Sequence, residues 1–176
     1  MEERGGKMGY IHIYTGNGKG KSTAAFGLAI RALMSGKKVY IGQFVKDMKY
    51  NETKIVDVLE NITIEQLGGG CFIQEVPTDK DKALAKEGLE RCYRNYISGE
   101  YDVVILDELT IALYYKLITK EDVIEKFFST KFNVELIITG RYCPNELIEK
   151  ADLVTEMKEI KHYYSKGVLS RDGIDK

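Results

Sequence analysis

The chain has 176 residues, of which 44% are hydrophobic and 30% charged, and its formal net charge is −1 at pH 7. This composition is that of an ordinary globular protein, and the length predicts a single domain over residues 1–176. A near-neutral charge excludes a global attraction to nucleic acid or to an anionic membrane, and the apolar stretches are too short to span a bilayer. We expect neither as a partner.

The cysteines and the start of the chain give an indication of the cellular compartment in which the protein is expected. The three cysteines, Cys71, Cys92 and Cys143, are scattered and form no C-x-x-C pair. An odd number at such spacings favours neither a disulfide framework nor a zinc site. Residues 1–4 read Met-Glu-Glu-Arg and lack the apolar core of a signal peptide. We therefore expect a cytoplasmic protein with reduced thiols.

Strand-like and helical segments alternate along the chain. Strands are predicted at residues 10–14, 39–45, 62–67, 103–108, 135–140 and 152–160. Helices are predicted at 24–33, 79–97, 119–128 and 144–148, with one more short helix capped by Asn51. Such alternation requires right-handed crossovers and a mostly parallel sheet covered by helices on both faces. Residues 1–8 are expected to be a short flexible N-terminus and residues 161–176 a C-terminal tail.

The most specific feature is the segment between the first strand and the first helix. It reads Thr-Gly-Asn-Gly-Lys-Gly-Lys-Ser-Thr. A Gly-rich loop of this kind points backbone N–H groups and a helix N-terminus into one concavity, which suits the oxygens of a triphosphate. Lys21 is expected to reach the phosphates and Ser22 to bind Mg²⁺. The predicted phosphate ligands are Thr15, Gly16, Asn17, Gly18, Lys19, Gly20, Lys21, Ser22 and Thr23.

Thr15 departs from the general pattern of this loop, G-x-x-x-x-G-K-S/T, because it occupies the place of the first glycine. Downstream, the apolar run of residues 103–106 ends in Asp107 and Glu108. Such a run is typical of a buried parallel strand, and P-loop proteins place a Mg²⁺-binding acid at its end. Spacing does not choose between the two acids, so both are candidate metal ligands with Ser22, and Mg²⁺ or Mn²⁺ is the expected cofactor.

Two basic sites are weaker candidates. Arg141 follows the strand at 135–140, on the side where α/β sheets bind ligands, so a phosphate or substrate contact is as expected as a plain surface position. Lys161 and His162 form a basic pair of the kind that is usually just solvated. Together the loop, the acids and the alternating elements predict an α/β, three-layer P-loop NTPase fold of the RecA-like type.

With these features in place, the chain resembles the P-loop type of ATP:corrinoid adenosyltransferase. The resemblance extends over nearly the whole chain, and the loop with its displaced first glycine is typical of that family. Thr15 therefore favours this family over a generic kinase. The matching segments are 14–27 with Arg31, 43–46, 104–110, 138–141 with Pro144, 147–148, 151–157 and 161–162.

The resemblance implies transfer of the 5′-deoxyadenosyl group of ATP to cobalt(I) of a corrinoid, with departure of the whole triphosphate. Because cobalt(I) is already a strong nucleophile, the protein must supply positioning and charge stabilisation rather than a general base. The implied catalytic residues are Lys19, Lys21 and Glu108. Weaker contacts to ATP or substrate are expected from Arg31, Arg141, Lys161 and His162.

The resemblance also implies ATP as co-substrate, held in the reversed sense along the loop, a flavoprotein-type reductant and a homodimer. The chain departs from the family on the corrinoid side. Members commonly carry Gly-x-Gly-Phe-x-Trp, whereas residues 68–73 read Gly-Gly-Gly-Cys-Phe-Ile and the chain has no Trp. Phe72 and Ile73 are therefore the candidates for an apolar wall under the corrin ring.

Two alternatives remain open from the sequence. A phosphoryl-transfer P-loop enzyme, such as a nucleoside kinase or an ATPase, would use Glu108 to activate a hydroxyl or water and would release ADP. A non-catalytic, ATP-gated corrinoid carrier is suggested by the missing Trp. It would bind the corrinoid tightly without turnover.

Overall fold

The computed structural model describes residues 8–45, 50–68 and 77–175. Its centre is a six-stranded sheet with the order β3-β2-β4-β5-β1-β6. Every strand pair is parallel, so the predicted parallel sheet is confirmed and the described residues contain no antiparallel pair. The strands are β1 (Ile11–Thr15), β2 (Val39–Gln43), β3 (Ile62–Gln66), β4 (Val103–Asp107), β5 (Glu135–Thr139) and β6 (Leu153–Glu156).

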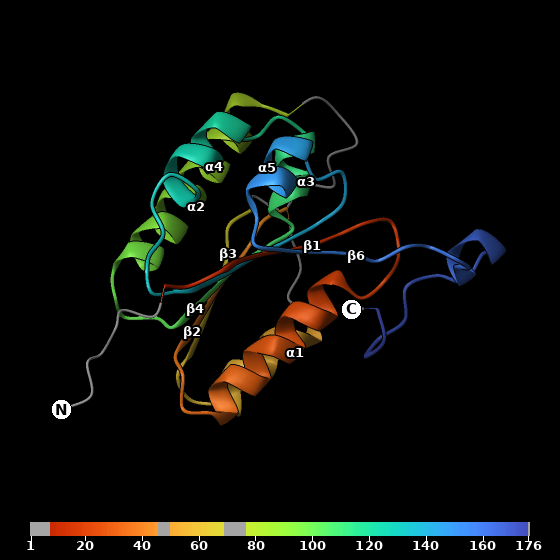
Figure 1. The fold of residues 1–176 in the computed structure, drawn as a ribbon. Coiled ribbons are helices and arrows are strands. Elements are labelled where there is room, and N and C mark those ends of the chain that lie inside the picture. Colours follow the sequence, from red (N-terminus) through yellow and green to blue (C-terminus); the bar gives the residue numbers. More distant parts are fainter. Residues whose placement is uncertain (1–7, 46–49, 69–76, 176) are drawn as a thin grey trace.

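Helices cover both faces of the sheet, as predicted (Figure 1). On one face lies α1 (Lys21–Met34), and on the other lie α2 (Asp79–Ile97), α3 (Leu109–Tyr114), α4 (Lys120–Phe127) and α5 (Asn145–Lys150). The structure also has two short 3₁₀ helices. In chain order, η1 (Asn51–Asp57) comes between β2 and β3, and η2 (Tyr163–Lys166) comes after β6. The result is the three-layer α/β architecture expected of a RecA-like P-loop fold.

The core forms two clusters because the central strands contribute buried side chains to both faces of the sheet. In β4, Val104 and Leu106 belong to the cluster under α2, whereas Val103 and Ile105 belong to the cluster under α1. Successive side chains of a strand point to opposite faces, so a strand covered on both sides needs apolar residues at every position. This is the physical reason for the unbroken apolar run that ends at Asp107.

The observed elements differ from the predicted ones beside the Gly-rich loop of residues 15–23, called the phosphate loop below. Helix α1 begins at Lys21 rather than at residue 24, because the end of the loop already forms its first turn, with the N–H of Ala24 donating to the carbonyl oxygen of Gly20 at 2.8 Å. Strand β6 ends at Glu156 rather than at residue 160. The chain beyond it turns onto the loop, where the carbonyl oxygen of Met157 accepts the N–H of Gly18 at 2.6 Å.

Two further differences concern short helices. The sequence did not predict α3, because a helix of 6 residues is too short for a periodic pattern to develop. The chain turns into it at Glu108, which adopts a left-handed conformation with φ of 59°. The prediction that Asn51 caps a helix was wrong. Tyr50 occupies the cap position of η1, and the Asn51 amide donates to the Asp172 carboxylate at 2.7 Å.

The C-terminal segment passes beyond the edge of the sheet and returns. Figure 1 shows the chain leaving β6, forming η2 and running back so that the C-terminus lies near α1. Of the predicted flexible N-terminus, only Met8 lies among the described residues. None of the helices described is long and apolar enough to cross a bilayer.

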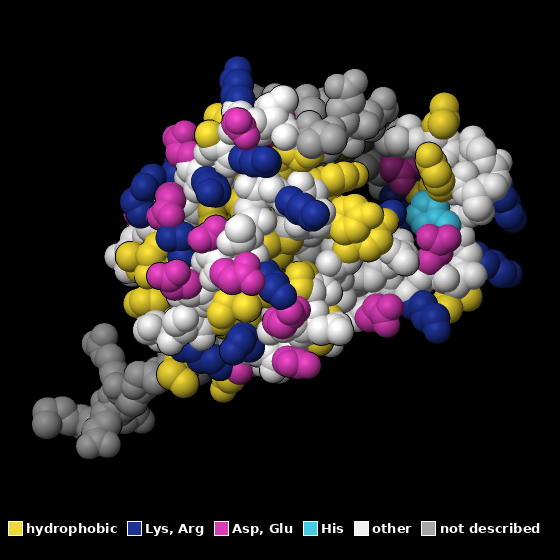
Figure 2. Space-filling model, turned by 90° about the horizontal axis from the view of Figure 1, so that it is seen from above, with side chains coloured by type: hydrophobic (Ala, Val, Ile, Leu, Met, Phe, Trp, Pro, Cys, Tyr) yellow, Lys and Arg dark blue, Asp and Glu magenta, His cyan; other side chains and the backbone are white. Residues whose placement is uncertain are grey.

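Figure 2 shows the face that carries α2 to α5. Lysine and arginine side chains are interspersed there with aspartate and glutamate. A nucleic-acid interface usually gathers basic side chains on one face, and the described part of this face shows no such stripe.

Candidate active site

The phosphate loop is pressed against the chain that follows β6. A Cβ atom at Gly16 would lie 2.5 Å from the carbonyl oxygen of Met157, and one at Gly18 would lie 2.6 Å from the same oxygen. Only glycine fits such an approach, and Gly16 also has a φ of 102° that favours glycine. The glycine that follows Thr15 therefore has a packing reason: it lets Met157 close the loop from behind.

Lys21 is buried at the start of α1, with 6% of its surface exposed. Its Nζ donates to the carbonyl oxygen of Gly18 at 2.7 Å, so the side chain folds back over the loop. Burial, together with the nearby charge of Arg141, lowers the pKa of Lys21. A poorly hydrated ammonium group at this place interacts strongly with any anion that enters the loop.

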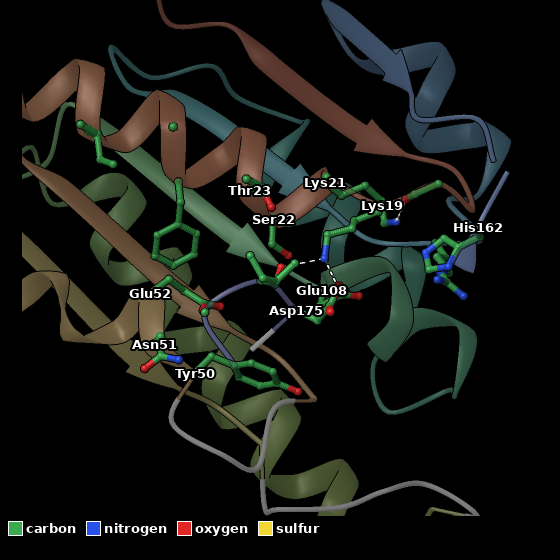
Figure 3. A pocket seen from close by; sticks show the side chains of 18 residues that line it. Lys19, Lys21, Ser22, Thr23, Tyr50, Asn51, Glu52, Glu108, His162 and Asp175 are labelled. Carbon is green, nitrogen blue, oxygen red and sulfur yellow. Dashed lines mark hydrogen bonds and ion pairs between the residues drawn. The ribbon is translucent and has the colours of Figure 1, made fainter. Parts of the chain in front are cut away.

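A pocket of about 640 Å³ opens in front of this loop (Figure 3). Its wall comes from the loop and α1, from the start of η1, from the chain after β4 and β5, and from the C-terminal tail. The predicted site residues that line it are Gly18, Lys19, Gly20, Lys21, Ser22, Thr23, Glu108, Arg141 and His162. Those that lie outside its lining are Thr15, Gly16, Asn17, Arg31, Asp107 and Lys161. Phe72 and Ile73 fall outside the described residues.

The two acids after β4 have different surroundings. Asp107 is fully buried, and its carboxylate accepts hydrogen bonds from the Thr139 hydroxyl at 2.7 Å and the Gln43 amide at 3.2 Å. Glu108 lines the pocket, and its backbone N–H donates to the same Thr139 hydroxyl at 2.9 Å. Thr139 thus joins the buried carboxylate to the backbone that presents Glu108.

Replacing Thr139 by valine tests this link. Valine has nearly the same shape but leaves a buried carboxylate and a part-buried N–H without the hydroxyl, so we expect a loss of about 1–3 kcal/mol in the free energy of unfolding. Urea denaturation measures it. Thr139→Ser keeps the hydroxyl and should cost clearly less; equal costs would mean that the methyl group, rather than the hydrogen bonds, matters.

Arg141 is held over the pocket by α3. The Thr110 hydroxyl donates to the backbone oxygen of Arg141 at 2.6 Å, which ties the first turn of α3 to the chain after β5. The guanidinium adds positive charge near Lys21. The carboxyl edge of the sheet therefore carries two cations and Glu108 around one pocket.

The sequence missed three parts of the pocket. They are Phe26, Gly27 and Ile30 of α1, Tyr50, Asn51 and Glu52 at η1, and Gly173, Ile174 and Asp175 of the tail. The α1 residues could have been found, because they follow Thr23 at helical spacing and share its face. The other two groups come from distant segments, and no local pattern indicates their approach.

The donor set also fits a divalent cation bound together with phosphates. The described residues contain no group of three or more His, Cys, Asp or Glu side chains that could hold a metal alone. Mg²⁺ is usually bound through one or two carboxylates, waters and substrate phosphates. Ser22 and Glu108 line one pocket with the phosphate loop and can supply the protein's share of such a site.

Comparisons of the sequence with known proteins point to one family. The family described as "ATP:corrinoid adenosyltransferase BtuR/CobO/CobP" matches residues 7–175. A corrinoid adenosyltransferase of Escherichia coli is 35% identical over 96% of this chain and 86% of its own length. One of Salmonella typhimurium is 34% identical over 99% and 87%, and one of Pseudomonas aeruginosa is 30% identical over 96% and 84%. The chain belongs to the ATP:corrinoid adenosyltransferase family.

Proposed function

We propose that this protein transfers the 5′-deoxyadenosyl group of ATP to cobalt(I) of a corrinoid and releases triphosphate. The observation that carries the proposal is a phosphate loop whose lysine, serine and facing glutamate line one pocket, in a chain of this family. The relatives at 30–35% identity are named corrinoid adenosyltransferases.

The reaction is a displacement at C5′ of the ribose. The cobalt(I) electron pair forms the Co–C bond while the C5′–O bond breaks and its electron pair leaves with the triphosphate. The protein's task is to hold C5′ in line with cobalt and to stabilise the charge that leaves. Lys21 would exchange its bond with the Gly18 carbonyl for phosphate oxygens, and the N–H groups of the loop would bind further oxygens.

We assign Mg²⁺, or Mn²⁺ in its place, to Ser22 and Glu108. When bound, the ion would neutralise part of the charge on the departing triphosphate. The two Asp107 oxygens accept bonds from Thr139 and Gln43, so we place Asp107 behind Glu108 as a positioning residue. Lys19, Arg141 and His162, which line the pocket, are proposed contacts to ATP or corrinoid; Arg31 and Lys161 are weaker ones.

The partners follow from the same chemistry. Cobalt(I) must be made by one-electron reduction of cobalt(II), and we propose a flavoprotein-type reductant for that step. We propose Phe72 and Ile73 for the apolar wall under the corrin. A homodimer and a cytoplasmic location complete the proposal, and sedimentation of the purified protein tests the dimer.

A product assay tests the reaction. The protein, Mg-ATP and a corrinoid kept reduced in the dark should give a light-sensitive Co–C bond and an equimolar amount of free triphosphate, read by absorbance and by phosphorus NMR. ADP without alkylated corrinoid would point to a phosphoryl-transfer enzyme. Tight corrinoid binding without turnover, even from cobalt(I), would point to a carrier.

A further inference from the structure

The C-terminal tail contributes to the wall of the ATP pocket. Gly173, Ile174 and Asp175 line it together with the phosphate loop and Glu108. Figure 3 shows Asp175 on the side of the pocket to which Lys19 extends. We call residues 171–175 the C-terminal strap. An anionic side chain in a pocket proposed to bind a triphosphate calls for a physical explanation.

Lys19 of the loop is turned toward the strap. Its Nζ donates to the backbone oxygen of Ile174 at 2.7 Å and pairs with the Asp175 carboxylate. It also lies 5.9 Å from the ring centroid of Tyr163. Burial disfavours the charged amine, but the contacts with Asp175 and Tyr163 outweigh it, so the pKa of Lys19 is raised. The ammonium is thus bound by the protein's own chain.

Asp175 is held in place as an anion. Its carboxylate accepts hydrogen bonds from the Tyr163 hydroxyl, from the Arg171 N–H at 3.1 Å and from the Arg171 Nε at 3.2 Å. The Arg171 guanidinium lies 4.6 Å from the centroid of the Tyr163 ring. Lys19 and Tyr163 lower the pKa of Asp175, and only 13% of its side chain is exposed.

The strap is anchored at a second place. The Asn51 amide at η1 donates to the Asp172 carboxylate at 2.7 Å. Asn51 and Lys19 both line the pocket, so the strap connects two parts of its wall. A nucleotide that fills the pocket must meet this connection.

We propose that Asp175 is an internal competitor of the ATP triphosphate: its carboxylate occupies Lys19, and the strap must release Lys19 before the triphosphate binds fully. The inference rests on the proposed function. Two anions that share one ammonium group repel each other. When only a fraction of the molecules is in the arrangement that can bind a ligand, the apparent affinity for that ligand is the intrinsic affinity multiplied by that fraction. The same competition would favour release of the triphosphate product.

The variant Asp175→Asn removes the charge and keeps the shape. We expect it to bind Mg-ATP and inorganic triphosphate about fivefold more tightly than the unmodified protein, the scale of one partly exposed ion pair. Isothermal titration calorimetry without corrinoid measures both. Glu159→Gln is the matched control, because it removes the same charge from an exposed residue between β6 and η2 outside the strap. Its affinity should not change.

A double-mutant cycle asks whether the effect acts through Lys19. Lys19→Met should weaken triphosphate binding, and adding Asp175→Asn in that background should give no gain, because the contested ammonium is gone. Equal gains in both backgrounds would overturn the proposal. So would equal or weaker binding by Asp175→Asn, since Asp175 would then support the site.

Hydrogen exchange reports on the strap directly. Its amides donate hydrogen bonds within the strap; the Asp175 N–H, for example, is bonded to the Arg171 oxygen at 2.8 Å. If the triphosphate releases the strap, these bonds open more often, so the amides are expected to exchange faster once triphosphate is added. Slower exchange would mean that the strap closes over the ligand and would overturn the inference. If the unmodified protein bound neither Mg-ATP nor triphosphate, the proposed function itself would fail, a result distinct from these.

Discussion

Lys21→Ala is expected to lower adenosyl transfer by about 10²- to 10³-fold, the usual effect of removing one preorganised charge from a site that stabilises a leaving anion. Lys21 is buried at the bottom of the loop, and its ammonium already contacts the Gly18 carbonyl. No other described side chain occupies that place, so water would have to replace it. Turnover of cobalt(I) corrinoid with saturating Mg-ATP measures the effect.

The control for this variant is Lys37→Ala. Lys37 is exposed in the turn between α1 and β2, at the other end of the helix that Lys21 begins. Its loss removes the same charge from the protein and should leave turnover unchanged. Circular dichroism must show that both variants are folded. Normal turnover by a folded Lys21→Ala protein would mean that this loop is not the ATP site.

Glu108→Gln is expected to lower turnover by about 10²-fold at ordinary Mg²⁺ and to raise the Mg²⁺ concentration needed for half-maximal rate. The amide keeps the size of Glu108, so the left-handed turn at this position can be retained, but its neutral oxygen is a weaker ligand for a hard cation. Initial rates over a Mg²⁺ titration, repeated with Mn²⁺, give both quantities.

Asp107→Asn is the matched comparison. Because Asp107 lies under the pocket and accepts bonds from Thr139 and Gln43, its main effect should be on the free energy of unfolding, with a smaller shift in the Mg²⁺ requirement. The opposite ranking, with Asp107→Asn changing the Mg²⁺ requirement more, would make Asp107 the metal ligand. The pair therefore settles the choice that the spacing of the two acids leaves open.

The predicted fold was confirmed because its signals are local. The run at 103–106 is apolar at every position, as a strand that is buried on both faces requires. The helix over Asp79–Ile97 has the predicted bounds, and its start is marked by Thr78 and Asp81, which form a capping box. The prediction failed at α3, a helix of 6 residues in which no periodic pattern has room to develop.

In the candidate site, too, some features follow from the local sequence and others depend on distant parts of the chain. The loop residues from Gly18 to Thr23 line the pocket, because consecutive residues at a strand-to-helix turn share one concavity whatever surrounds them. Thr15 and Gly16 lie outside the lining, and Gly16 instead accommodates Met157. Which acid faces the pocket depends on the turn at Glu108, which Thr139 holds from a neighbouring strand.

The sequence by itself determined the place of the Gly-rich loop, the parallel sheet and, through the resemblance, the family. The loop and the sheet follow from backbone sterics and from periodicity within a few residues, and the family follows from the matching segments. Only the tertiary structure decided that Glu108 lines the pocket while Asp107 is buried, that η1 joins the wall, and that Asp175 meets Lys19 across 156 positions of the chain. Such contacts depend on how the crossovers and the returning tail pack, and residue spacing carries no information about that packing.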